Sequence, residues 1–90
     1  MNFSALYADL AAQFVQLDHG EDAVLAGRDI LESYEEVAGS YLGVQWIEER
    51  DLGSGGIQNL VVLNCEHLVL RIDYVDRVEQ RPFVNSFVLN

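Results

Sequence analysis

The sequence predicts a single α+β domain in which two N-terminal helices cover one face of a four-stranded antiparallel sheet. Apolar residues recur every three or four positions up to about residue 42, and at alternate positions after Gly43. Turn residues separate the alternating segments, so consecutive strands are expected to pair as a meander. Ninety residues, half of them hydrophobic, suit one modest core and are too few for two domains. A two-layer packing of helices on the sheet follows.

The first helix is expected over about residues 4–18. Its apolar residues have the three-four spacing of a helix face: Phe3, Tyr7, Leu10, Phe14 and Leu17. Ser4 is a suitable N-cap, and Gly20 a suitable C′ glycine. The helix has few charged residues, which predicts that it is packed over much of its circumference or takes part in a dimer.

The second helix is expected over about residues 22–42, antiparallel to the first because the connection is short. On a helical wheel, one arc gathers the residues expected to face the core: Ile30, Leu31, Tyr34, Val37, Ala38, Tyr41 and Leu42. The opposite arc gathers acids: Asp22, Asp29, Glu32 and Glu36, with Glu21 and Glu35 beside them. Gly27 could interrupt this helix, since glycine costs about 1 kcal/mol relative to alanine.

Four strands are expected, at about residues 44–51, 57–63, 67–75 and 82–89. The first ends in four charged residues, which suits a strand that leaves the core or lies at a sheet edge. The second is apolar on both faces, which predicts a central strand covered on both sides. The third alternates most clearly, and Pro82 is tolerated where it opens the last.

The chain is strongly acidic, with fifteen acids, five arginines, no lysine and a net charge of −10. Residues 1–56 hold eleven acids and two arginines (−9), and residues 57–90 hold four acids and three arginines (−1). Phosphates would be repelled, so we expect no direct binding to nucleic acid and none to anionic membranes. A basic patch on another protein would be attracted, including a patch that holds nucleic acid.

The cellular location is predicted from features that the sequence lacks. No apolar run approaches the roughly 18 to 20 residues of a membrane span, and the N-terminus lacks the basic segment of a secretory signal. The single cysteine, Cys65, cannot form an internal disulfide, which agrees with a reducing compartment. We therefore expect a cytoplasmic protein of a bacterium or of a phage-infected host.

Catalysis and metal binding have little support in the sequence. The adjacent acids Glu35-Glu36 and Glu48-Glu49 lack an environment that would drive their pKa values apart. Residues 18–22 offer carboxylates and one imidazole, but their spacing matches no metal loop and equally suits the end of one helix and the start of the next. Cys65 and His67 lack a third, orienting group. We expect no enzyme, no metal and no cofactor.

The acidic face is the remaining candidate site. Its expected partner-binding residues are Asp22, Asp29, Glu32, Glu35, Glu36, Glu48 and Glu49. Ordinary helix surfaces mix both signs of charge, whereas Arg28 is the only Lys or Arg between Met1 and Glu49. Such a surface serves either binding or solubility. Trp46 and Tyr41, beside its end, are either interface anchors or core residues.

The general profile, a small lysine-free acidic α+β domain without a catalytic motif, is similar to that of phage-encoded inhibitors such as anti-CRISPR proteins and of bacterial toxin-immunity proteins. The similarity lies in composition and involves no motif. It implies a non-enzymatic inhibitor that occupies a basic, nucleic-acid-binding groove as a mimic of nucleic-acid charge. The alternative is a structural, adaptor or assembly protein that forms homo-oligomers, with a homodimer through strand 82–89 and the first helix.

Overall fold

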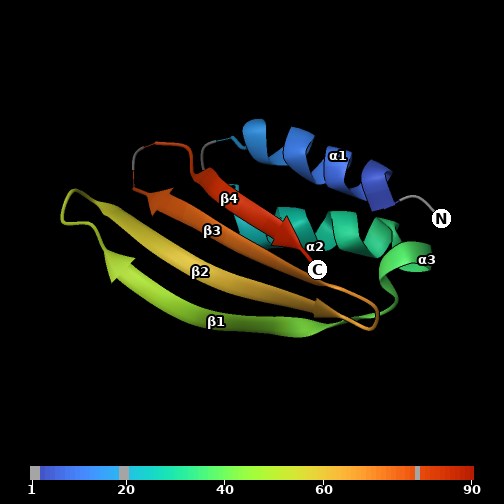
Figure 1. Ribbon diagram of the computed structural model, residues 1–90. Coiled ribbons are helices and arrows are strands. Elements are labelled where there is room, and N and C mark those ends of the chain that lie inside the picture. Colours follow the sequence, from blue (N-terminus) through green and yellow to red (C-terminus); the bar gives the residue numbers. More distant parts are fainter. Residues whose placement is uncertain (1–2, 19–20, 79) are drawn as a thin grey trace.

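The computed structural model describes residues 3–18, 21–78 and 80–90. Its elements are α1 (Phe3–Val15), α2 (Ala23–Ser33), α3 (Glu35–Ala38), β1 (Tyr41–Asp51), β2 (Gly56–Cys65), β3 (Val69–Arg77) and β4 (Phe83–Leu89). The strands pair antiparallel in the order β1-β2-β3-β4. Both long helices lie on the same face of this sheet (Figure 1), and no described helix covers the other face. The predicted two-layer α+β meander is confirmed.

The core lies between the two long helices and the sheet. Its largest fully buried side chains are Leu6, Leu10, Leu17, Leu31, Val61, Leu63, Leu70 and Ile72. Those of α1 are four residues apart and those of β2 and β3 are two apart, because one side of each element faces the core. The ring of Phe87 lies 4.9 Å from that of Tyr7 and 5.3 Å from that of Phe14, and these contacts join β4 to α1.

The first helix is shorter than predicted. It ends at Val15, and the connection that follows still buries Leu17 against the core. The three-four spacing of apolar residues therefore continues past the end of the helix, because Leu17 in the following connection is also buried in the core. Gly20, the predicted C′ glycine, lies outside the described residues.

The prediction of a single helix over residues 22–42 is wrong beyond Ser33. The start was placed well, since the Asp22 carboxylate accepts hydrogen bonds from the N–H groups of Val24 at 2.8 Å and Leu25 at 3.3 Å. The end was missed, because the backbone of Tyr34 (φ −113°, ψ 37°) leaves the helical region and separates α2 from the short α3.

Gly39 then turns the chain into the sheet. Its φ of 76° favours glycine, and a Cβ there would lie 2.7 Å from the Glu66 Cβ. Tyr41 and Leu42 consequently belong to β1 and not to a helix, and Leu42 is exposed rather than buried. Apolar neighbours such as these suit the end of a helix and the start of a strand equally well, so spacing alone could not locate the boundary.

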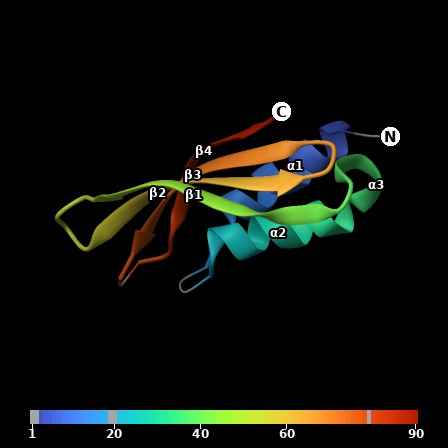
Figure 2. The same cartoon turned by 90° about the horizontal axis from the view of Figure 1, so that it is seen from below.

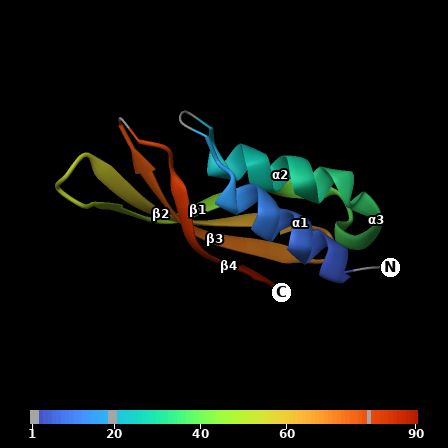
Figure 3. The ribbon, with the colours of Figure 1, turned by 90° about the horizontal axis from the view of Figure 1, so that it is seen from above.

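β1 and β2 extend farther than predicted, whereas β3 begins and ends two residues later than predicted and β4 begins one residue later. The hairpin that joins β1 to β2 reaches beyond the helices (Figures 2 and 3). β2 is central, as expected, but helices cover only one of its faces. Val61 and Leu63 belong to the core beneath the helices. Val62 points to the opposite face, where it is nevertheless buried. The run of apolar residues in β2 is therefore explained by burial within the sheet itself, and the second covering layer that it had predicted is not needed.

Gly27 does not interrupt α2, and its lack of a side chain lets the helix approach the sheet. A Cβ there would lie 3.2 Å from Ile72 Cδ1, 3.3 Å from Leu70 Cδ2 and 3.5 Å from Phe14 Cζ. Glycine thus weakens the isolated helix but permits its closest contact with β3 and α1.

We predict that Gly27→Val lowers the free energy of unfolding by about 1–3 kcal/mol, because the added methyl groups overpack this contact. Leu25→Val places the same residue at an exposed position of the same helix and should change it by no more than about 0.5 kcal/mol. Urea unfolding followed by circular dichroism measures both. Equal effects for the two variants would contradict the tight contact.

Candidate functional site

The acids of α2 and α3 are exposed to solvent, and Glu32 and Glu35 lie near the start of β1, beside Ser40 and Tyr41. Asp29, Glu32, Glu35 and Glu36 are all exposed, whereas the opposite side of α2 is buried at Ala23, Gly27 and Leu31. The break at Tyr34 therefore divides the predicted stripe between two helices but leaves these four carboxylates exposed to solvent. We call Asp29, Glu32, Glu35 and Glu36 the acidic helix surface.

One cation lies against this surface. Arg28 Nε donates a hydrogen bond to Glu32 Oε1 at 2.6 Å, and its guanidinium lies 4.6 Å from the centre of the Tyr41 ring. This pair raises the pKa of Arg28 and partly neutralises Glu32. Within the described residues, Asp29, Glu35 and Glu36 have no ion pair. The surface therefore keeps an excess of negative charge.

A second group of acids surrounds Tyr74 near the start of α2. Burial, followed by the charges of Asp76, Asp22 and Glu49, raises the pKa of the Tyr74 hydroxyl. Partial desolvation and the neighbouring Asp22 also raise the pKa of Asp76, whose side chain remains exposed at the surface. We call Asp22, Glu49 and Asp76 the Tyr74 cluster. It contains two of the predicted partner-binding residues.

Asp76 was missed by the sequence reading, which placed it in a loop. The available signal was the alternation of β3, since Ile72, Tyr74 and Asp76 occupy every second position and therefore share a face. Extending the predicted strand 67–75 by one residue would have placed Asp76 on the same face as Tyr74.

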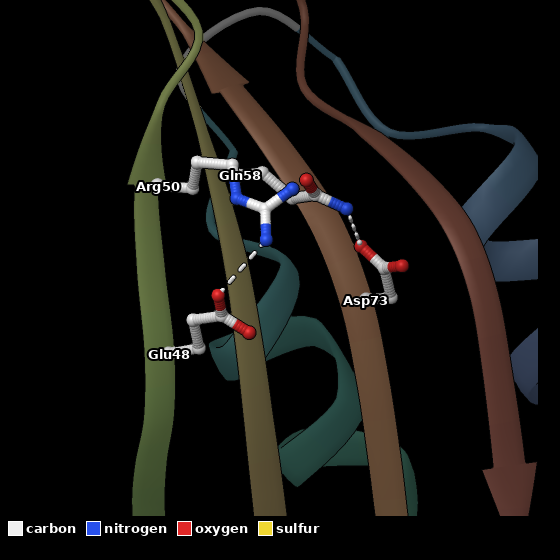
Figure 4. A network of polar contacts seen from close by, with 4 residues as sticks. All are labelled: Glu48, Arg50, Gln58 and Asp73. Carbon is white, nitrogen blue, oxygen red and sulfur yellow. Dashed lines mark hydrogen bonds and ion pairs between the residues drawn. The ribbon is translucent and has the colours of Figure 1, made fainter.

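Glu48 lies apart from the other predicted site residues. It pairs across the sheet with Leu60 and lies on the face without helices, where Arg50 Nη2 donates to its Oε1 at 3.1 Å (Figure 4). On the same face, Gln58 Nε2 donates to Asp73 Oδ1 at 3.0 Å. Adjacent residues of a strand point to opposite faces, and this separates Glu48 from Glu49.

Neither catalysis nor metal binding gains support from the geometry of the described residues. No group of three potential metal ligands occurs among them, and the candidate segment 18–22 includes His19 and Gly20, which lie outside them. Cys65 is buried, and burial raises the pKa of its thiol, which disfavours the nucleophilic thiolate.

Trp46 lies on the surface and not in the core, which decides between its two interpretations. It is 57 % exposed, and its neighbour Ile47 is 55 % exposed. No residue of β1 is buried, although the strand spans Tyr41–Asp51. Aromatic side chains exposed on an edge strand are typical of protein interfaces.

A groove of about 490 Å³ lies between the second half of α1 and the first half of β4. Apolar side chains of Phe14, Leu17 and Val84 line it, together with the guanidinium-bearing residues Arg77 and Arg81. Arg77 lies over the Phe83 ring at 4.8 Å and donates to the Arg81 carbonyl at 2.9 Å. The groove is therefore less acidic than the helix surface.

Comparisons with known proteins give no indication of function, so a functional proposal depends on the geometry described above. No protein-family model, no curated protein and no solved structure matches the chain. Among the described residues, no helix is both long enough and apolar enough to cross a membrane.

We predict that Asp76→Asn raises the stability of the fold at pH 7. A carboxyl with a raised pKa in the folded state is destabilising when charged, and this penalty is lost as the pH falls through the raised pKa. The stability difference from wild type should therefore shrink as the pH is lowered towards about 4. Thermal unfolding at several pH values measures it.

Asp29→Asn is the matched control, because it removes one negative charge from the exposed acidic helix surface. Its effect on stability measures how much is gained simply by lowering the net negative charge of the protein by one. If Asp29→Asn were to stabilise the protein as much as Asp76→Asn does, with the same pH dependence, the local effect of the Tyr74 cluster would be disproved.

Proposed function

We propose that the protein is a non-enzymatic inhibitor whose acidic helix surface occupies a basic groove of another protein, of the kind that holds nucleic acid. The observation that carries this proposal is the excess of exposed carboxylates on α2 and α3, opposed by Arg28 alone. Like charges placed together cost stability, and a basic partner would relieve that cost.

The spacing of the acids indicates how far nucleic-acid charge is imitated. Asp22 and Asp29 lie two turns apart, which corresponds to about 10.5 Å along the helix axis. Double-stranded DNA has one charge per about 1.7 Å of axis. The mimicry is therefore local, and binding would rest on a few lysines or arginines of the partner meeting Asp29, Glu35 and Glu36. The Tyr74 cluster would extend this contact at the start of α2.

A second candidate function is that of an adaptor or assembly protein, and the exposed apolar residues of the two edge strands favour it. Leu42, Trp46 and Ile47 are exposed on β1, and Phe83 and Val88 on β4. Contacts of this kind would depend little on salt, whereas binding through the acidic helix surface would weaken as salt screens the charges.

Charge reversal tests the inhibitor proposal. The immobilised chain is used to retain proteins from a bacterial lysate at low salt, and a retained nucleic-acid-binding protein is then purified for titration. We expect Asp29→Lys to weaken its binding about tenfold, and Asp29→Lys/Glu36→Lys to weaken it further. The chain should also displace nucleic acid from that protein, and less so as salt rises.

Glu48→Lys is the control, because it makes the same change of charge on the opposite face of the sheet. We expect it to weaken binding much less than Asp29→Lys. Equal losses for the two single variants would reduce the effect to net charge and refute a role for the acidic helix surface. The proposal would also fail if the retained protein kept its full affinity for nucleic acid.

A further inference from the structure

β4 is the edge strand of the described sheet on the side opposite β1, and part of its backbone faces away from the sheet. Val69 and Asn90 exchange both of their backbone hydrogen bonds, at 3.1 and 3.0 Å. Bonded and outward-facing residues alternate along an antiparallel strand. Val88 therefore also bonds to β3, whereas Phe87 and Leu89 turn their N–H and C=O groups away from it. This edge can accept an extended peptide as a fifth strand.

A row of apolar side chains on α1 lies beside this edge. Phe3, Tyr7 and Val15 are exposed and Ala11 is half-buried, and their spacing of four residues places them on one side of the helix. Tyr7, Ala11 and Val15 line the groove of about 490 Å³ whose other wall is the first half of β4. Figure 1 shows α1 alongside β4, and the rings of Tyr7 and Phe87 are in contact. A peptide added to β4 would therefore also contact this apolar side of α1.

The charge of the groove is opposite to that of the protein as a whole. None of the described residues that line it is acidic, although the chain has fifteen acids, and two of the five arginines, Arg77 and Arg81, line it where β4 begins. Within the described part of the chain, neither arginine forms an ion pair, and the buried Nε of Arg77 has no hydrogen-bond partner. This end of the groove is therefore suited to an anion.

We propose that the groove binds an extended peptide of another protein, antiparallel to β4, with acidic side chains at the C-terminal end of the peptide. Antiparallel pairing places that end at the start of β4, where Arg77 and Arg81 lie. Apolar side chains at alternate positions of the peptide point toward the helix layer and pack against Tyr7 and Val15. Backbone hydrogen bonds supply affinity, and the side-chain contacts supply specificity.

A bulge in β4 limits the length of the pairing. The register of β3 and β4 shifts at Asn85, which has no residue directly opposite it in β3. Regular pairing of the peptide therefore covers Phe87 and Leu89, and its C-terminal part continues past the bulge along the groove toward Arg81. A bulge at a sheet edge disfavours long continuous pairing. A short segment consequently fits the site better than a strand of a large sheet.

Charge argues for a partner other than a second copy of the chain. If β4 paired with β4 about a two-fold axis, the arginines of one copy would meet the last residues of β4 in the other. Residues 82–90 contain no acidic side chain, so Arg77 and Arg81 would gain no opposite charge. A small apolar acid would satisfy the arginines but would leave the outward backbone groups of Phe87 and Leu89 unpaired. A peptide with an acidic C-terminal end satisfies both requirements.

The groove is separate from the acidic helix surface. It is formed by α1, β4 and the segments before and after them, whereas the carboxylates of that surface belong to α2 and α3. Peptide binding therefore goes beyond the proposed inhibition and does not depend on it. The variant Asp29→Lys/Glu36→Lys should retain the peptide with its full affinity even where it loses the basic partner.

Selection from a peptide library gives the first test. The immobilised full chain is exposed to phage-displayed random peptides of twelve residues, and the enriched peptides are synthesised and titrated into the isotopically labelled chain by nuclear magnetic resonance. We expect apolar residues at alternate positions followed by Asp or Glu, with dissociation constants of about 1–100 µM. The largest shifts should occur at amides of α1 and β4.

Matched variants of the chain test the two parts of the groove. Val15→Asp should weaken binding of the selected peptide at least about tenfold, whereas Leu25→Asp, the corresponding change at an exposed position of α2, should change it less than about twofold. Arg81→Gln should weaken binding about fivefold, and Arg50→Gln at the opposite edge of the sheet should not. Circular dichroism verifies that each variant keeps the fold.

Changes to the peptide test the strand pairing and its direction. N-methylation of an amide that faces β4 removes a hydrogen bond and should weaken binding at least about tenfold, whereas methylation of the next amide, which faces away, should have little effect. A peptide of the same composition with its acids moved to the N-terminal end should also bind at least about tenfold more weakly, because its acids lie far from Arg77 and Arg81.

Several results would overturn the proposal. One is a selection that enriches no peptide, or only peptides without an acidic C-terminal end. Equal losses for Val15→Asp and Leu25→Asp would place the binding outside the groove. A dimer of the chain that Val15→Asp dissociates would assign the groove to a second copy. Decanoate that shifts the same amides with the same affinity as the peptide would assign it to a small apolar acid.

Discussion

The close approach of α2 to the sheet at Gly27 is the constraint on which the rest of this structure depends. Ile72, Leu70 and Phe14 all lie within reach of the position that a Cβ would occupy. This contact packs α2 against both the sheet and the neighbouring α1, and it leaves Asp29 and Glu32 on the other side of α2 exposed to solvent. Since the helices are shorter than the strands, the same placement leaves the hairpin of β1 and β2 without cover (Figure 2).

Two different surfaces follow from this one arrangement. The helices display carboxylates that lack basic partners, and the free edge of β1 displays Val44, Trp46 and Ile47. Neither surface is needed for the core, which is complete between the helices and the sheet at residues such as Leu31 and Ile72. Residues that cost solubility or stability without serving the core are the strongest candidates for binding.

The fold was predictable from the sequence because burial imposes a period on each element, as Leu6 and Leu10 show for α1 and Leu70 and Ile72 for β3. The candidate site was predictable only in part. Spacing placed Asp29 on the exposed side of α2, but it could not reveal the break at Tyr34. The split of Glu48 from Glu49, the position of Asp76 beside Tyr74 and the exposure of Trp46 depend on strand register and on which edge is free, and these are properties of the assembled sheet.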